Sequence, residues 1–212
     1  MSVAMKESGS EKEGRELWET RHLELGSTAE VLLSHLPPRL CFEPEGEVFE
    51  AWWNLHPDEH PVITMHGREV AIPRWQAAYG QDYRFSGQVS EALPLPDVMR
   101  PILEWAREQI DDRLNGVLMN WYDARQGHYI GAHRDSTIGL VPRTPIVTIS
   151  FGEERVFRMR PHKGKGFEDV SVGHGDVLVI PWKTNLTHTH EVPYAKRYVA
   201  RRISMTLRAF QQ

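Results

Sequence analysis

The chain has 212 residues, of which 40% are hydrophobic and 25% are charged, and its formal net charge is −4. This is the size and composition of a globular protein with one well-packed core. The sequence contains no signal-peptide core and no apolar run of membrane-spanning length, so we expect an intracellular protein, in the cytoplasm or nucleus, with no membrane partner. Its single cysteine, Cys41, excludes an intramolecular disulfide framework and a thiolate-rich zinc site.

Charge is distributed unevenly along the chain. Residues 1–60 carry five Lys or Arg against thirteen Asp or Glu, a net charge of −8, whereas residues 153–208 carry eleven against six, a net charge of +5. Such asymmetry can focus an anionic ligand toward one face. The chain as a whole is not strongly basic, as a DNA-coating protein would be, so charge leaves a nucleic-acid partner open without arguing for it.

The N-terminal part is predicted to be helical after a short leader. Residues 1–14 are polar and charged, which predicts a disordered leader, and residues 15–212 are expected to form a single domain. A first helix is predicted over Arg15–Leu36, ending at Pro37, which cannot continue it. Two further helices are predicted over Glu47–Leu55 and Pro96–Ile110 from apolar residues at helical spacing.

Beyond Gly116 the pattern changes to short β-type runs separated by turn residues. Strands are predicted over Val117–Tyr122, Tyr129–Ala132, Ile146–Phe151, Arg155–Arg160, Asp169–Val172, Asp176–Ile180, Leu186–Val192 and Arg202–Arg208. Helices followed by strands predict an α+β fold in which an antiparallel sandwich packs on helices.

A candidate metal site begins at His133-x-Asp135. On an extended chain residues i and i+2 point to the same side, so this imidazole and carboxylate can converge on one ion. One distant histidine, His188 or His190 on a later strand, would complete two nitrogens and one oxygen on one face of the metal. That is the facial triad of non-haem Fe(II) oxygenases, which leaves positions open for a cosubstrate and O₂. The tripeptide alone is a weak signal that needs supporting residues.

The last predicted strand supplies that support. Arg202 and Arg208 are six residues apart and therefore share one face, while apolar residues occupy the other. A dicarboxylic cosubstrate needs a planar, permanently charged, bidentate partner, which arginine provides. The alternative is that both are solvated basic residues near the C-terminus.

With these elements in order, the chain resembles the AlkB family of Fe(II)- and 2-oxoglutarate-dependent dioxygenases over about two thirds of its length. The motifs that carry the resemblance are Ile72-Pro-Arg74, Tyr83-Arg-Phe-Ser-Gly87, Asn120-x-Tyr122, His133-x-Asp135, Pro145-Ile-Val-Thr-Ile-Ser-Phe-Gly152, His174-Gly-Asp-Val-Leu178, His190-x-Val-Pro193 and Arg202-x-Ser-x-Thr-x-Arg208. No single motif is decisive, but their number, order and spacing make the match specific.

The resemblance implies a double-stranded β-helix (jelly roll) core flanked by N-terminal helices and a substrate lid. It implies Fe(II), 2-oxoglutarate and O₂ as metal, cosubstrate and oxidant. Asn120 and Tyr122 would bind the carboxylates of 2-oxoglutarate, Arg202 would pair with its distal carboxylate, and Arg208 would lie near the end beside the metal. Ser204 stands where the family has an Asn among the cosubstrate residues.

The resemblance also selects the third iron ligand. The family places it just before an x-Val-Pro segment, as in His190-Glu-Val-Pro, so we take His133, Asp135 and His190 as the iron ligands. His188 is then expected to support a ligand or face the substrate. Some family members carry acidic residues shortly after the iron-binding Asp that help to read the base, whereas Thr137 and its neighbours here include no acid.

The activity implied is oxidative demethylation of N-alkylated bases in DNA or RNA, releasing succinate, CO₂ and formaldehyde. The partner would be a single-stranded or flipped-base nucleic acid, whose base would stack on aromatic side chains. The candidate substrate residues are Arg74, Trp75, Tyr79, Tyr83, Thr137 and His188. For the three aromatic residues the alternative is core packing. We expect the protein to act as a monomer.

Three alternatives remain open. The same chemistry could hydroxylate a small metabolite, a nucleotide or a protein side chain. A cupin-like binding module without oxygenase activity is a second possibility, but its Glu is expected several residues after the paired histidines, whereas Glu191 is adjacent. Finally, the basic residues of 155–165 could contact phosphates, or could be a solvated edge that discourages strand aggregation.

Overall fold

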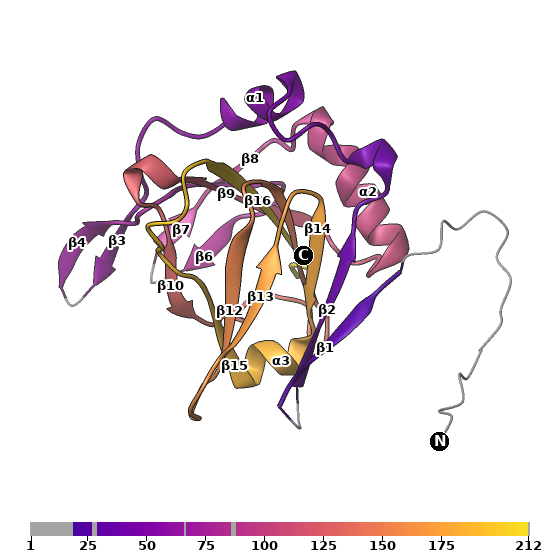
Figure 1. The fold of residues 1–212 in the computed structure, drawn as a ribbon, viewed down its shortest axis with the longest axis vertical. Helices are drawn as coiled ribbons and strands as arrows, with labels where there is room; N and C mark the ends of the chain where they lie inside the picture. The colour runs from indigo at the N-terminus through magenta and orange to yellow at the C-terminus, as the bar shows by residue number, and fades with distance from the viewer. Residues whose placement is uncertain (1–18, 27–28, 66, 86–87, 212) are drawn as a thin grey trace, which may run out of the picture.

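Two facing β-sheets organise the residues that the computed structural model describes, namely 19–26, 29–65, 67–85 and 88–211 (Figure 1). The predicted leader, residues 1–14, and the first residues of the first predicted helix lie outside these ranges. Within them, no helix combines the length and the apolar character needed to cross a bilayer.

The larger sheet has eight strands in the order β1-β2-β14-β11-β16-β9-β5-β8. Neighbouring strands are antiparallel except for the β5–β8 pair. Their bounds are β1 Arg21–Leu25, β2 Ala29–His35, β5 Trp75–Tyr79, β8 Ala92–Leu93, β9 Gly116–Asp123, β11 Ile146–Gly152, β14 Asp176–Ile180 and β16 Arg201–Arg208.

The smaller sheet has four strands in the order β10-β15-β12-β13. They are β10 Ile130–His133, β12 Arg155–Pro161, β13 Glu168–Val172 and β15 His188–Val192. Two separate hairpins complete the β structure, formed by β3 Val62–Met65 with β4 Arg68–Ala71 and by β6 Tyr83–Phe85 with β7 Gln88–Ser90. The β3–β4 hairpin projects from the body of the protein (Figure 1).

Two of the helices cover the outer face of the larger sheet, and a third lies at one end of the sandwich. The helices are α1 Glu47–Trp53, α2 Arg100–Gln109 and α3 Trp182–Thr187, with short 3-10 turns at η1 Pro38–Leu40, η2 Asp97–Met99 and η3 Ala124–Gln126. Helices α1 and α2 lie along one side of the larger sheet, and α3 lies at one end of the sandwich (Figure 1). The Trp121 indole N–H on β9 donates to the carbonyl of Trp52 at 2.9 Å, which fixes α1 to the sheet.

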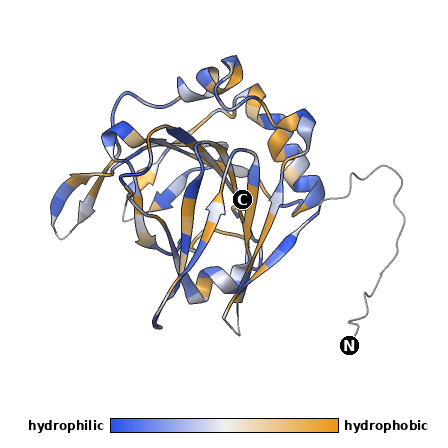
Figure 2. Ribbon diagram, viewed as in Figure 1, coloured by the Kyte–Doolittle hydropathy of each residue, from blue (hydrophilic) through white to orange (hydrophobic). Residues whose placement is uncertain are grey.

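Strand β16 shows how the pleat separates core from site. Ile203, Met205 and Leu207 are fully buried in the apolar cluster shared with α1 and α2, as the predicted alternation requires. The intervening side chains, which include Arg202 and Arg208, face the smaller sheet. Figure 2 shows apolar and polar residues mixed along the strands of the sandwich.

The predicted jelly roll is confirmed, and so are the helices near Glu47 and Pro96. The first predicted helix is wrong, because residues 21–25 and 29–35 form the β1–β2 hairpin. Its residues suit a helix locally, but β2 pairs with β14 and thereby extends the larger sheet, and this long-range pairing overrides local propensity. The strand predicted from Leu186 starts only at His188, because residues 182–187 form α3.

Candidate metal centre and cosubstrate cavity

Three predicted ligands converge at one point between the sheets. One ligand atom from each of His133, Asp135 and His190 lies within 4.8 Å of the others. The register of the smaller sheet explains the convergence, since His133 at the end of β10 stands directly opposite His190 on β15. The Nε2 atoms of the two histidines lie 3.6 and 3.8 Å from Oδ1 of Asp135.

The hydrogen bonds around His133 define its available nitrogen. Its Nδ1 lies 2.9 Å from the carbonyl oxygen of Gly131. A carbonyl can only accept, so Nδ1 carries the proton and Nε2 presents a lone pair toward Asp135. This is the arrangement that ligating histidines adopt, because the second nitrogen donates to a neighbouring oxygen and fixes the ring.

The Asp135 carboxylate is fully buried and lies against a cation. Its Oδ2 accepts hydrogen bonds from Nε (2.9 Å) and Nη2 of Arg208, while Oδ1, on the side of the histidines, has no hydrogen-bond partner. Burial alone would raise the pKa of this carboxyl, but Arg208 and the two histidines outweigh burial and hold the pKa well below its usual range. An unpaired, ionised oxygen facing two imidazoles fits a divalent metal.

His190 is held neutral by its surroundings. Its ring stacks on Phe157 with centroids 5.2 Å apart, and burial followed by the proximity of His133 lowers its pKa to about 3. Metals bind the neutral imidazole, so His190 is in the protonation state that a ligand requires. The donor set of two imidazoles and one carboxylate therefore fits Fe(II).

Asn185, which the sequence analysis missed, holds the loop that carries Asp135. Its Oδ1 accepts from the backbone N–H of Asp135 and its Nδ2 donates to the carbonyl of the same residue, both at 3.1 Å. Asn185 lies on α3, which Thr184 ties to β2 through a 2.7 Å hydrogen bond to the carbonyl of Glu30. Because α3 was predicted as coil and strand, no local signal connected Asn185 to the metal site.

A cavity of about 380 Å³ opens beside the triad. The larger sheet lines it with residues that include Asn120, Tyr122, Ser204 and Arg208, all of which the resemblance assigned to the cosubstrate. Strand pairing brings them together, since Asn120 stands opposite Ser204. The structure thus gathers these four predicted residues at one wall of the cavity.

Arg202 is a buried cation without a carboxylate partner in the described part of the chain. Its side chain is fully buried, Nη2 donates to the Ser150 hydroxyl at 2.8 Å, and neither Nε nor Nη1 has a hydrogen-bond partner. Burial lowers the pKa of its guanidinium. A buried, unpaired charge is costly, so this arrangement fits an anionic group that supplies the missing acceptors.

Arg74, predicted as a substrate residue, is buried at the cavity wall and orients two amides. Its Nε donates to Oδ1 of Asn120 at 2.8 Å and its Nη2 donates to Oε1 of Gln76 at 3.1 Å. A guanidinium can only donate, so both amide oxygens face Arg74 and both amide nitrogens are left for other acceptors. The Asn120 NH₂ is then oriented as a donor within the cavity.

The other predicted substrate residues divide into two groups. Tyr83 lines the cavity, where Arg208 lies 4.7 Å from its ring centroid and burial raises the pKa of its phenol to about 12. Trp75 and Tyr79 lie on the opposite face of β5, in the core with the helices, so the prediction that they stack on substrate is not supported. The pleat of β5 turns Gln76 toward the cavity instead. Neither Thr137, which is half-buried, nor His188, which is buried, is part of the cavity wall.

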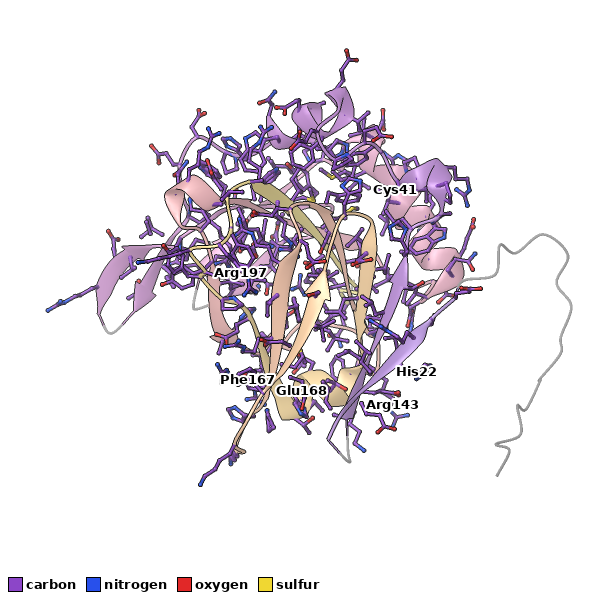
Figure 3. All side chains as sticks on the ribbon, viewed as in Figure 1. His22, Cys41, Arg143, Phe167, Glu168 and Arg197 are labelled. Atoms are coloured by element: carbon purple, nitrogen blue, oxygen red, sulfur yellow. The ribbon has the colours of Figure 1, made fainter. Side chains whose placement is uncertain are left out.

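The three arginines of the basic segment 155–165 are engaged within the protein, whereas Lys163 and Lys165 are exposed. Arg155 is buried and donates to the carbonyls of His128 and Ala200. Arg158 forms a bidentate pair with Asp169 and Arg160 pairs with Glu191. Phe167, labelled beside Glu168 in Figure 3, lies 3.9 and 4.9 Å from the guanidiniums of Arg158 and Arg160. These contacts favour a structural edge over a strip that contacts phosphate.

Comparison with known proteins agrees with this geometry. The family model for the 2OG-Fe(II) oxygenase superfamily matches residues 54–208. The chain is 32% identical to the mouse (Mus musculus) DNA oxidative demethylase ALKBH2 over 157 residues, which cover 69% of this chain and 65% of that protein. The human (Homo sapiens) protein of the same name is also 32% identical over 157 residues, which cover 69% of this chain and 60% of that protein.

A solved structure supports the fold. The structure of OsALKBH1 superimposes with a TM-score of 0.56 at 15% sequence identity, covering 90% of this chain and 99% of that one. At this identity the likeness concerns the fold alone. The chain spans about two thirds or less of the length of the curated relatives named above.

Proposed function

This chain belongs to the 2OG-Fe(II) oxygenase superfamily, and we propose that it is an Fe(II)- and 2-oxoglutarate-dependent dioxygenase that removes methyl groups from ring nitrogens of bases in DNA or RNA. The observation that carries the proposal is the triad of His133, Asp135 and His190 beside a cavity whose lining residue Tyr122 contacts the buried Arg202, a guanidinium without a carboxylate partner among the described residues. The relatives named as DNA oxidative demethylases suggest the substrate class.

Fe(II) would be held by His133, Asp135 and His190, and with 2-oxoglutarate and O₂ it supplies the oxidising chemistry. The role of Arg208 is to keep the Asp135 carboxylate ionised and oriented through its paired hydrogen bonds. Asn185 holds the backbone of Asp135 in place, and Phe157 holds the His190 ring. At the metal, the surrounding residues therefore fix the positions and the protonation states of the three ligands.

The cosubstrate would lie against the face of the paired strands β9 and β16 that lines the cavity. Arg202 would pair with its distal carboxylate, since the Nε and Nη1 donors of this buried guanidinium have no hydrogen-bond partner among the described residues. Tyr122, whose ring lies 5.1 Å from that guanidinium, and the Asn120 amide, oriented by Arg74, would donate to its oxygens. Ser204 stands opposite Asn120 and lines the same wall.

The overall reaction balances as follows. A methyl C–H bond of the substrate is hydroxylated by one atom of O₂, and the other oxygen atom enters succinate as 2-oxoglutarate loses CO₂. The resulting hydroxymethyl group on a ring nitrogen breaks its C–N bond, releasing formaldehyde and returning a proton to the nitrogen. The Tyr83 phenol stays protonated at neutral pH because its pKa is about 12, so it lines the cavity as an uncharged group.

The test is to incubate Fe(II)-loaded protein with 2-oxoglutarate, O₂ and single-stranded oligonucleotides that contain one methylated base. We expect succinate and formaldehyde in equal amounts. The mass of the oligonucleotide should fall by about 14 mass units, which corresponds to one CH₂ group. Succinate formation without formaldehyde or base change would refute demethylation. Turnover with a panel of metabolites but with no oligonucleotide would instead support hydroxylation of a small molecule.

A further inference from the structure

The charge of the cavity wall is strongly one-sided. Among the described residues that line it, four carry guanidinium groups, namely Arg74, Arg84, Arg134 and Arg208, and Asp135 alone carries a carboxylate. Asp135 is already bonded to Arg208 and placed as an iron ligand. Another carboxylate near Tyr83, that of Asp82, lines a second cavity and accepts a hydrogen bond from the Ala92 backbone.

Bound iron and cosubstrate do not reverse this balance. Fe(II) contributes two positive charges and 2-oxoglutarate two negative charges, so together they add none. The Arg208 charge offsets that of Asp135, which leaves Arg74, Arg84 and Arg134 without a counter-charge on the wall. A cation entering this space meets like charges, of which the buried Arg74 acts in a partly desolvated setting where electrostatic interactions are stronger than in bulk water, whereas Arg84 and Arg134 are exposed.

The hydrogen-bonding groups of the cavity wall are also one-sided, because donors are available where acceptors are occupied. Arg74 occupies the amide oxygens of both Asn120 and Gln76. The Asn120 NH₂ is assigned to the cosubstrate, so Gln76 is the residue that offers its NH₂ group to a substrate. The Gln76 side chain is only 4% exposed, and its Nε2 has no hydrogen-bond partner. The wall therefore offers donors and calls for a ligand that presents acceptors.

Methylated bases differ in their net charge and in the hydrogen-bonding groups that flank the methyl group. Methylation at N1 of adenine or N3 of cytosine produces a cation whose exocyclic amino group is a donor. Methylation at N1 of guanine or N3 of thymine replaces an N–H, so the base stays neutral. N3-methylthymine presents carbonyl acceptors on both sides of the methyl group, and N1-methylguanine presents its C6 carbonyl on one side. We propose that the cavity selects the neutral methylated bases and discriminates against the cationic ones, an inference that rests on the proposed function.

The test compares matched pairs in one oligonucleotide sequence. Formaldehyde release is measured for N1-methylguanine against N1-methyladenine and for N3-methylthymine against N3-methylcytosine. We expect kcat/KM to be about tenfold or more higher for the neutral member of each pair, a difference of about 1.4 kcal/mol in transition-state stabilisation. Equal turnover, or preference for the cationic base, would overturn the inference.

Two variants test the electrostatic cause. Ser136 is exposed at the cavity wall, so Ser136→Asp adds a carboxylate there, while Ser136→Asn is the matched uncharged control. Arg84→Gln removes an exposed guanidinium, and Arg21→Gln removes one from β1, at the far edge of the larger sheet. Ser136→Asp and Arg84→Gln should each lower the ratio of kcat/KM for the neutral base to kcat/KM for the cationic base. Ser136→Asn and Arg21→Gln should leave this ratio unchanged. A ratio that does not move with the added or removed charge would refute the cause.

A binding measurement separates this inference from the proposed function. Absence of formaldehyde from all four oligonucleotides would refute demethylation. Affinities of the same oligonucleotides for protein loaded with Mn(II) and 2-oxoglutarate without O₂ would still report the charge preference. Tighter binding of the neutral members would support the inference, and equal or weaker binding would overturn it.

Discussion

Replacing Asn185 by alanine tests whether a residue outside the ligand set positions the metal site. The change removes both hydrogen bonds to Asp135 and leaves a buried N–H and a buried carbonyl without partners. Each such group costs about 1–3 kcal/mol, so the free energy of unfolding should fall by about 2–4 kcal/mol once some relaxation is allowed. Because the backbone of Asp135 would no longer be held, metal affinity should weaken by about 10–100-fold, as is typical when a group that supports a ligand is lost.

The assay is anaerobic titration of the folded protein with Fe(II), or with Co(II) as a spectroscopic substitute. Circular dichroism should confirm that each variant is folded at the temperature used. Asn54→Ala, at the exposed C-terminal end of α1, is the matched control and should leave metal affinity unchanged. If Asn185→Ala loses stability but binds metal as tightly as Asn54→Ala, the residue supports the fold only, and its positioning role is refuted.

Three further predictions follow from the site and its surroundings. Alanine at His133, Asp135 or His190 should abolish binding of stoichiometric Fe(II), measured by metal analysis after gel filtration; retained metal in His133→Ala would favour a cupin-like site. Arg202→Lys should raise the KM for 2-oxoglutarate about tenfold or more with metal affinity unchanged, because lysine cannot replace the guanidinium fork; an unchanged KM would remove Arg202 from the cosubstrate site. Burial, followed by the proximity of His60, lowers the pKa of His128 to about 4. Since an unfolded histidine titrates near ~6.5, the free energy of unfolding should fall by up to about 1.4 kcal/mol per pH unit for this group as pH falls from about 6.5 to about 4. His128→Asn should flatten that slope in urea titrations, and an unchanged slope would contradict this assignment.

Several features could be predicted because they depend on local pattern. The alternation of Ile203, Met205 and Leu207 with polar residues determines which face of β16 enters the core, whatever the strand pairs with. The residue types of His133-x-Asp135 likewise determine the metal chemistry, since two neighbouring donors on an extended segment point the same way. The helices α1 and α2 were found from their apolar spacing for the same reason.

Other features depend on pairing between distant strands, which local pattern does not encode. The hairpin β1–β2 has residues that suit a helix, and only its place beside β14 makes it a strand. Trp75 was a plausible stacking residue until the register of β5 against β9 turned it toward the helices.

By itself the sequence determined the donor types, their spacing and the two faces of the last strand, because these follow from the geometry of a few consecutive residues. Two histidines, His188 and His190, satisfied that local geometry equally well, and residue spacing alone could not choose between them. The family resemblance selected His190, and tertiary structure gives the physical reason, because the antiparallel pairing of β10 with β15 sets His190 opposite His133 and leaves His188 away from the cavity wall, opposite Pro161. It also brought Asn185 to Asp135 from fifty residues away, a contact that only the packed chain can make.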